Sequence, residues 1–196
     1  MVDKRVERGE QTYNRIMMAA IDIISEEGVS EITASNLSQR VGVSKSNIFH
    51  HFKATSDIPI AVLKMMLDEL KQPMNEEAFE DVEVLLNCME QSVFGLEGSH
   101  NKLHRAFFSF YNASLFNKTY QEILSTFLIS TELEVTKLLL KCVGHKFDVN
   151  QVSGYARLII ACLDGIGLHI LMGSDKEAYL ESWKIQKKLI VNEMTK

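Results

Sequence analysis

The chain contains few of the residues that mark fibrous, disordered or disulfide-stapled proteins. Only two of its 196 residues are proline and only three are cysteine, with no CxxC pair among them. This composition excludes collagen-like and low-complexity chains. The odd number of widely spaced cysteines predicts neither a disulfide framework nor a cysteine-rich zinc site, and a reducing cytoplasm is the expected location.

No apolar segment predicts a membrane span or a secretory signal. The N-terminal residues, MVDKRVERGEQ, carry positive charges with no apolar stretch behind them, unlike a secretory signal. The longest apolar run, residues 156–172, is interrupted by Arg157, Asp164 and His169 and is shorter than the roughly 20 residues that cross a bilayer. We therefore expect a soluble protein with no membrane partner.

The motifs of catalysis are missing as well. The sequence has no GxSxG, no HExxH and no phosphate-cradling glycine loop, nor a cysteine–histidine or paired-carboxylate pattern on the expected helices. His100 and His104 have the i, i+4 spacing that can hold a metal ion, but no further ligand accompanies them. We expect neither an enzyme nor a cofactor or metal site.

Acidic residues are in excess, but not along the whole chain. The net charge is −5, yet residues 1–56 hold seven Lys/Arg and seven Asp/Glu, so the acidic excess belongs to the remainder. Residues 32–56 contain Arg40, Lys45 and Lys53 and no carboxylate. A local basic face of this kind is compatible with a polyanionic partner.

Apolar residues recur at helical spacing nearly throughout, and no stretch alternates as a strand does, which predicts an all-α fold. Glycines and capping residues divide the pattern into about nine helices: one ended by Gly28, then 34–41, 44–52, 55–72, 82–94, 102–116, 120–143, 152–172 and 176–194. Residues 54–57 are expected to join a small three-helix domain, residues 1–54, to a larger helical domain, residues 55–196.

Residues 33–52, TASNLSQRVGVSKSNIFHHF, have the pattern of a helix-turn-helix with Gly42 at the turn. Five apolar residues are spaced as its inner face: Leu37, Val41, Val43, Ile48 and Phe52. The helical period then turns four polar residues of the second helix outward: Lys45, Ser46, Asn47 and His50. In such a motif these positions meet base edges in the major groove, where Asn47 can bind adenine and Lys45 can reach guanine or a phosphate.

The run EEGVSEITASNLSQRVGVSKSNIFHHFKATSDI, residues 26–58, resembles the N-terminal domain of the tetracycline-repressor (TetR) family of bacterial transcription regulators. The glycine before the second helix, the GVS turn and the aromatic-rich HHF end occur together, whereas the rest of the chain matches only in helix number and length. The resemblance implies a homodimer that binds double-stranded operator DNA through paired recognition helices and is released by a small-molecule effector.

Carried over by position, the resemblance assigns DNA contacts to seven residues: Thr33, Ser35, Ser44, Lys45, Ser46, Asn47 and His50. Phe49 and Lys53 complete the expected DNA-binding set. Phe49 stands where the family usually has tyrosine, and Thr55 where it usually has lysine, so two usual phosphate contacts are missing. Lys53 can compensate for this loss. Lys4, Arg5 and Arg8 would either form a flexible basic arm on the DNA or simply be solvated.

The segment from His104 to Phe116 concentrates five aromatic rings that cannot all share one helix face. One interpretation is an apolar effector pocket, for which the candidate lining residues are Met65, Met66, Met89, Phe107, Phe108, Tyr111, Asn112 and His169. The other is an aromatic-rich core without a cavity. The resemblance favours the pocket, and the stretch DGIGLHILMG is also similar to choline-responsive members of the family.

The last two helices carry more apolar surface than a terminal hairpin can bury alone. Gly165 and Gly167 each cost roughly 1 kcal/mol relative to alanine inside a helix, a cost that a close helix crossing can offset. We therefore predict a two-fold, four-helix dimer interface made by Ile159, Leu163, Gly165, Ile166, Gly167, Ile170, Leu180, Trp183, Lys187 and Ile190. Asp164, a carboxylate within this apolar helix, is expected at the surface or in the interface.

Taken together, these features predict a ligand-responsive repressor of transcription that binds a pseudo-palindromic operator as a homodimer. The competing hypothesis is a helical adaptor that binds protein and has lost sequence-specific DNA binding. It would account for the acidic total and for the departures at Phe49 and Thr55.

Overall fold

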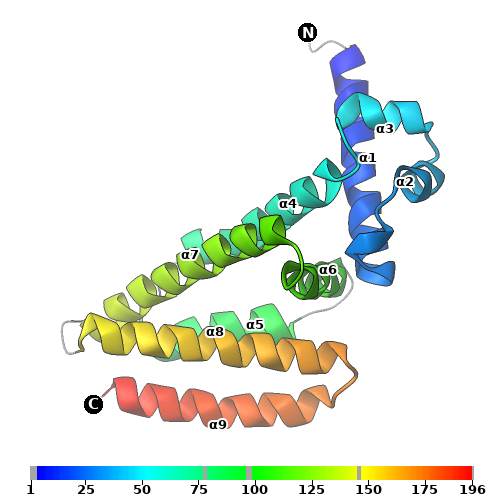
Figure 1. The fold of residues 1–196 in the computed structure, drawn as a ribbon. Helices are drawn as coiled ribbons and strands as arrows, with labels where there is room; N and C mark the ends of the chain where they lie inside the picture. Colours follow the sequence, from blue (N-terminus) through cyan, green and yellow to red (C-terminus); the bar gives the residue numbers. More distant parts are fainter. Residues whose placement is uncertain (1–3, 77–78, 96–98, 145–146, 196) are drawn as a thin grey trace. The chain divides into compact units, whose positions relative to one another are not determined.

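A computed structural model of the chain describes residues 4–76, 79–95, 99–144 and 147–195, and their side chains except at 4–5, 71–76 and 99–100. These residues form nine α-helices, a 3₁₀ turn (η1, Val29–Glu31) and no strand, which confirms the predicted all-α class (Figure 1). The helices are α1 (Lys4–Glu27), α2 (Ala34–Val41), α3 (Lys45–His51), α4 (Asp57–Glu76), α5 (Val82–Phe94), α6 (Ser99–Ser114), α7 (Lys118–Val143), α8 (Val149–Leu171) and α9 (Lys176–Met194).

Capping residues set the ends of the first three helices, as the sequence predicts. Gly28 follows α1 with φ 101°, and Gly42 follows α2 in the left-handed conformation with φ 73°, a region that glycine enters without steric cost. The Thr33 Oγ1 accepts a hydrogen bond from the Asn36 N–H at 3.1 Å, and the Ser44 Oγ accepts one from the Asn47 N–H at 3.2 Å. Each hydroxyl satisfies an amide that has no partner inside its helix.

Later helices differ from the predicted extents. α4 continues to Glu76, so Pro73 lies in its last turn rather than after its end. α6 lies a few residues earlier than expected, and α7 and α8 begin earlier. The early starts have caps that the prediction overlooked: the Asn117 Oδ1 accepts from the Tyr120 N–H at 3.2 Å, and the Asp148 Oδ1 accepts from the Asn150 N–H at 2.7 Å.

The chain divides into two compact units, residues 1–70 with 98–124 and residues 71–97 with 125–196. In the first, α1 packs against α2, η1 and α6 (Figure 1). The predicted apolar stripe of α1 is buried: Ile16, Ala19, Ala20, Ile23 and Ile24. The division follows packing rather than sequence order, because α6 lies along α1.

In the second unit α5, α8 and α9 lie side by side and share a core with the later part of α7 (Figure 1). Its buried members include Leu86, Met89, Leu139, Ile159, Leu163, Trp183 and Ile190. α8 is long and apolar enough to cross a membrane by length and composition alone, but only 28% of its most apolar window is buried in the chain. Much of the apolar surface of α8 therefore faces outward.

Candidate nucleic-acid interface

The second helix of the predicted helix-turn-helix, α3, presents an exposed polar face. Lys45, Ser46, Asn47 and His50 are exposed, as are Ser44 just before the helix and Phe49 within it. The Asn47 side-chain amide makes no hydrogen bond within the described part of the chain, so its donor and acceptor are both available. The residues predicted to face a groove therefore do point away from the domain.

Ser44 and Ser46 are engaged with each other. Their hydroxyl oxygens lie 2.9 Å apart within hydrogen-bonding distance, while the Ser44 Oγ also caps α3. This arrangement fixes both side chains at the first turn of α3. The start of the helix is thereby held in one conformation, which reduces the side-chain entropy lost when it binds a partner.

The inner side of α3 is anchored on α1. Ile48 and Phe52 are buried, and the Phe52 ring stacks on Tyr13 with centroids 5.2 Å apart. His51 also contacts Tyr13, edge to face at 6.3 Å. Burial lowers the pKa of the His51 imidazole, and the charge of His50 lowers it further. The aromatic contact with Tyr13, which the sequence pattern did not reveal, holds the helix firmly against its support. Of the predicted inner residues, Val43 is only half-buried.

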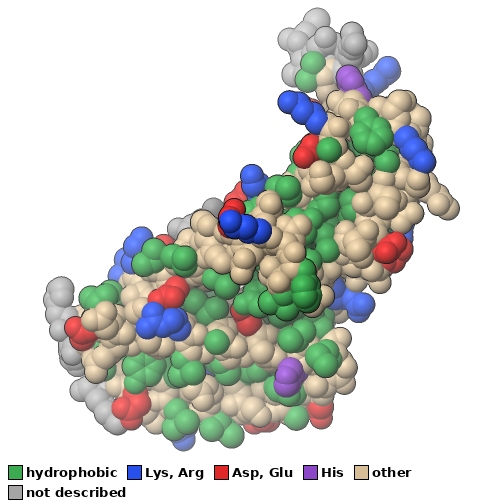
Figure 2. Space-filling model, in the orientation of Figure 1, with side chains coloured by type: hydrophobic (Ala, Val, Ile, Leu, Met, Phe, Trp, Pro, Cys, Tyr) green, Lys and Arg blue, Asp and Glu red, His purple; other side chains and the backbone are tan. Residues whose placement is uncertain are grey.

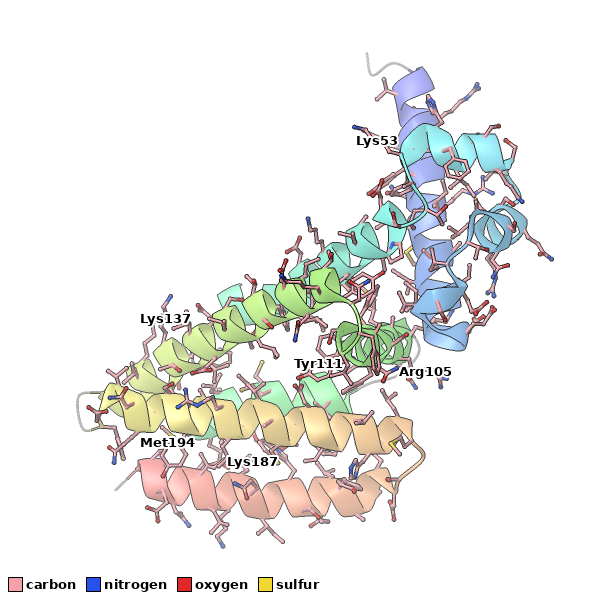
Figure 3. The ribbon with its side chains drawn as sticks, in the orientation of Figure 1. Lys53, Arg105, Tyr111, Lys137, Lys187 and Met194 are labelled. Atoms are coloured by element: carbon pink, nitrogen blue, oxygen red, sulfur yellow. The ribbon has the colours of Figure 1, made fainter. Side chains whose placement is uncertain are left out.

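The basic face is smaller than the charge count suggested. The Arg40 guanidinium pairs with the Glu26 Oε2 and the Glu27 Oε1, both at 2.9 Å. These carboxylates come from α1, outside the carboxylate-free window, and largely neutralise Arg40. Lys45 and Lys53 are exposed and form no ion pair in the described part of the chain, and the Lys53 side chain points outward after the end of α3 (Figure 3).

Further contacts hold the helix-turn-helix. The Arg15 Nη2 donates to the Val41 carbonyl at 2.6 Å, so a cation caps the C-terminal end of α2. Thr33 and Ser35, the predicted phosphate contacts beside α2, are exposed. Arg8 is exposed on α1, which begins at Lys4; the side chains of Lys4 and Arg5 lie outside the described residues. The predicted flexible arm is therefore helical from Lys4 onward.

The predicted effector-binding residues fall in both compact units. In the first unit, Met66 and Phe107 are buried, Met65 and Phe108 are half-buried, and Tyr111 and Asn112 are exposed on α6. The rings of Phe107, Phe108 and Tyr111 form one cluster with centroids 5.5–6.3 Å apart. In the second unit, Met89 is buried in the core, and the exposed His169 ring is hydrogen-bonded to the Tyr179 hydroxyl. The described residues include no group of three that could hold a metal ion, and the His100 side chain is not among them.

Most residues predicted for the dimer interface are covered within the chain. Ile159, Leu163, Ile166, Gly167, Trp183 and Ile190 are buried in the core of the second unit, and Ile170 and Leu180 pack against it. The Lys187 Nζ binds the Glu90 Oε2 and the Asn87 Oδ1, both at 2.6 Å. Only Gly165 of the predicted set is fully exposed. The large apolar residues that face outward are instead Val149, Leu158 and Leu168 on α8, Met172 just after α8, and Ile185 and Leu189 on α9.

The carboxylate of Asp164 lies half-buried on α8. Burial raises its pKa to about 6, and no nearby charge contributes to the shift. A carboxylate in this setting is partly protonated near neutral pH and would gain from a cationic partner.

The model of the family described as "Bacterial regulatory proteins, tetR family" matches residues 16–62, which span the helix-turn-helix and the start of α4. The fatty acid metabolism regulator protein of Bacillus subtilis is 28% identical over 92 residues, 45% of this chain and 47% of the relative. The regulator SrpR of Pseudomonas putida is 30% identical over 63 residues, 32% of this chain and 30% of its own length. The chain thus spans less than half of these curated relatives.

Solved structures share the fold over nearly the whole chain. A transcriptional regulator of Rhodococcus sp. Rha1 superposes with a TM-score of 0.78 at 22% identity, covering 92% of this chain and 96% of the other. A transcriptional regulator of Saccharomonospora viridis in complex with choline superposes with a TM-score of 0.74 at 17% identity, covering 88% and 93%. Residues 16–62 thus match the N-terminal domain of the tetR family of bacterial regulatory proteins, and nearly the whole chain shares its fold with solved transcriptional regulators.

Proposed function

We propose that the protein is a repressor of transcription that binds a pseudo-palindromic operator as a homodimer and leaves it when a small apolar or amphipathic effector binds. In this proposal residues 1–54 read the DNA, and residues 55–196 bind the effector and form the dimer. The observation that supports this proposal most directly is that Lys45, Ser46, Asn47 and His50 are exposed on one side of α3. The other side of α3 is buried against α1.

The chemistry of this row suits the major groove. Asn47 offers the amide pair that recognises adenine, and Lys45 offers a cation for guanine or phosphate. Thr33, Ser35 and Lys53 supply exposed donors on both sides of the row, where the phosphate backbone would run. Phe49 adds apolar surface, 47% exposed, but no hydrogen-bond donor.

A homodimer is supported by the unburied apolar surface of the last two helices. Leu158 and Leu168 on α8, Met172 just after α8, and Ile185 and Leu189 on α9 are 40–76% exposed. Hydrophobic side chains are visible over α8 and α9 on the face shown in Figure 2. Apolar patches of this kind mark interaction surfaces, and a two-fold axis would present two copies of α3 to successive turns of one face of the DNA.

Two effector chemistries deserve direct tests. The aromatic cluster of Phe107, Phe108 and Tyr111 suits an apolar or amphipathic molecule, and Asp164 suits one with a cationic group. One structural neighbour was solved with choline, and one relative is named as a regulator of fatty acid metabolism. Choline and a long-chain fatty acid are therefore the first probes, with the thermal unfolding midpoint and release from DNA as readouts.

A mobility-shift titration across salt concentrations tests the DNA-binding proposal. A fragment from the region upstream of the gene should bind with a steep salt dependence, and a shuffled fragment of equal length should bind far more weakly. A chain that shows equal or no affinity for both fragments in low salt is not an operator-binding repressor. That result would favour the helical adaptor.

A further inference from the structure

Phe49 is an exposed aromatic residue on α3, the helix proposed to read DNA. Its side chain is 47% exposed, whereas the neighbouring Ile48 and Phe52 are 0% and 6% exposed. In the described part of the chain, Phe49 takes no part in the ring contacts that tie α3 to α1. The helix is therefore anchored without the Phe49 ring, and about half of that ring is left to meet a partner.

Two lysines flank Phe49 in the sequence. Lys45 lies four residues before it, one turn earlier on the same side of α3, and side chains in this relation have Cβ atoms about 6 Å apart. Lys53 follows Phe49 by four residues, just beyond the end of α3, and points outward (Figure 3). Both lysines are exposed, and neither forms an ion pair with a described residue. A ring between two cations that bind phosphates is held at the edge of the groove, within reach of the bases.

Phe49 and Asn47 lie on opposite flanks of α3. Residues two apart in an α-helix point about 200° apart around its axis. Ser46 and His50 are about 40° apart and occupy the outermost side between these flanks. The two DNA strands border the major groove on its two sides, so the flanks of a helix in the groove face different bases. Phe49 therefore meets a different base from the adenine proposed for Asn47.

Only one group in the major groove offers the Phe49 ring a matching surface. The base edges there present hydrogen-bond donors and acceptors, and the single apolar group among them is the C5 methyl of thymine. A phenyl ring that covers a phosphate or an amino group removes its water without replacing the lost hydrogen bond, which is unfavourable. A thymine methyl can be covered without that cost, and the burial of both apolar surfaces favours the contact.

We propose, on the basis of the proposed operator binding, that Phe49 packs against the C5 methyl group of one thymine in each half-site. The ring recognises the methyl group and none of the hydrogen-bonding groups of the base. The operator therefore requires a methyl group at one position on the flank of α3 away from Asn47. The base 5-methylcytosine, whose methyl is on the same ring atom, satisfies the same contact.

Replacing single thymines by deoxyuridine tests the contact with the unaltered chain. Uracil lacks only the methyl group, so base pairing and the hydrogen-bonding groups in the groove are kept. In the fragment from upstream of the gene, the loss of one buried methyl should weaken binding about fourfold at one thymine of each half-site, and about 15-fold when both half-sites are changed. Uracil at the other thymines should leave the dissociation constant within about twofold. Fluorescence anisotropy at constant salt concentration measures each value.

Variants of Phe49 assign the effect to its ring. Phe49→Ala should bind the thymine fragment more weakly than the wild-type chain does, and should bind the thymine and uracil fragments equally, because the group that contacts the methyl is gone. Phe49→Leu keeps an apolar side chain and should retain most of the preference for thymine. Phe116→Ala is the matched control, since it removes a phenyl ring that is 89% exposed but lies outside α3. It should keep the wild-type preference.

Methylated cytosine provides a test of opposite sign. A cytosine–guanine pair placed at the sensitive position of both half-sites should bind more weakly than the original thymine–adenine pair. Methylation of that cytosine at C5 should then raise the affinity of the wild-type chain about fourfold for each half-site. The same methylation should not change the affinity of Phe49→Ala.

The outcomes separate this inference from the proposed function. Sequence-specific binding that no uracil substitution weakens would overturn the thymine contact while leaving operator binding in place. An effect of uracil that persists in Phe49→Ala would do the same, because the methyl would then be recognised by another group. A chain that shows no sequence-specific binding to the fragment would overturn the proposed function and this inference together.

Discussion

At the level of single residues, two cations that are close together in the sequence differ in whether they form ion pairs. Arg40 is paired with Glu26 and Glu27, whereas Lys45 is exposed and forms no ion pair with any described residue. A count of charges in a window cannot distinguish the two, because the carboxylates that neutralise Arg40 lie on another helix. The residues available to a polyanion are therefore fewer, and more sharply placed, than the composition indicates.

Replacing Asn47 with alanine should relax base preference at one position of each half-site and cost on the order of 1–3 kcal/mol of binding free energy. The reason is that its exposed amide can pair with one base edge. Selection of binding sites from random DNA measures the preference. Asn150→Ala, an exposed asparagine of the other unit, is the control, and an unchanged selected sequence for Asn47→Ala would show that Asn47 does not read a base.

Lys187→Ala should destabilise the fold by about 3 kcal/mol, since it leaves Glu90 without its cation in a site where both side chains are only about 15% exposed. Lys184→Ala on the same helix removes an exposed pair with Glu181 and should cost far less, because water and salt screen an exposed ion pair. Urea unfolding gives both values. Equal losses of unfolding free energy for the two variants would show that burial does not set the cost of removing one partner of an ion pair. The double variant Lys187→Met with Glu90→Leu should recover most of the stability.

Asp164 should make the fold more stable in mild acid than at neutral pH. Burial raises its pKa from 3.8 to about 6 in the folded chain, so the folded state keeps a proton that the unfolded state has released. The contribution is complete below about pH 4 and declines by about 3 kcal/mol as the pH rises through 6. Asp164→Asn should remove this part of the pH dependence of the urea midpoint, while Asp68→Asn, at an exposed site, should leave it unchanged.

At the level of elements, α6 is joined to the end of α1 and to η1 by three polar contacts at successive turns. The Lys102 Nζ binds the Asp22 Oδ1 at 2.7 Å. The Nε of Arg105, which is labelled in Figure 3, donates to the Ser25 carbonyl at 3.0 Å. The Ser109 Oγ accepts from the Val29 N–H at 3.1 Å. The end of α1 and the turn before α2 are thus held by a helix some 80 residues further along the chain.

Ser109→Ala should speed hydrogen exchange at Val29 and the rest of η1 and should cost about 1 kcal/mol, because it removes the acceptor of a part-buried amide. Mass spectrometry or NMR measures the hydrogen-exchange rate at η1, and urea unfolding measures the loss of unfolding free energy. Ser92→Ala is the matched control, since its hydroxyl bonds only to the Met89 carbonyl of its own helix. Unchanged protection of η1 would show that the contact does not hold the turn.

Helix ends and helix faces were predictable from the sequence to different degrees. Ends marked by a glycine or a hydroxyl cap, as at Gly28, Gly42, Thr33 and Ser44, were predicted correctly because the signal is local. The face of α8 that packs against the core was harder to predict. Because α8 is apolar on most sides, the spacing of its apolar residues does not show which face is buried within the chain. Leu163 and Ile166 were assigned to an interface for this reason, although both are buried in the core.

At the level of the whole molecule, a chain with a net charge of −5 is proposed to bind DNA, which is itself negatively charged. Such a chain has little long-range attraction for DNA, so its salt dependence must come from a few placed cations. In a homodimer every such cation counts twice. The slope of log affinity against log salt concentration therefore reports how many subunits engage the DNA, as well as how many contacts each one makes.

Lys53→Ala should reduce that slope by about 2, since one phosphate contact is lost from each of two subunits and each contributes about 0.9. Lys137→Ala, an exposed lysine on α7 in the other unit (Figure 3), should leave it unchanged. In a Gly165→Leu background that has become single-subunit, the same loss should fall to about 1. In a symmetric complex both copies of Lys53 make the same contact, so the variant must lose both contacts together. If the slope falls by only about 1 in the dimer without the Gly165 change, only one subunit contacts the DNA through Lys53.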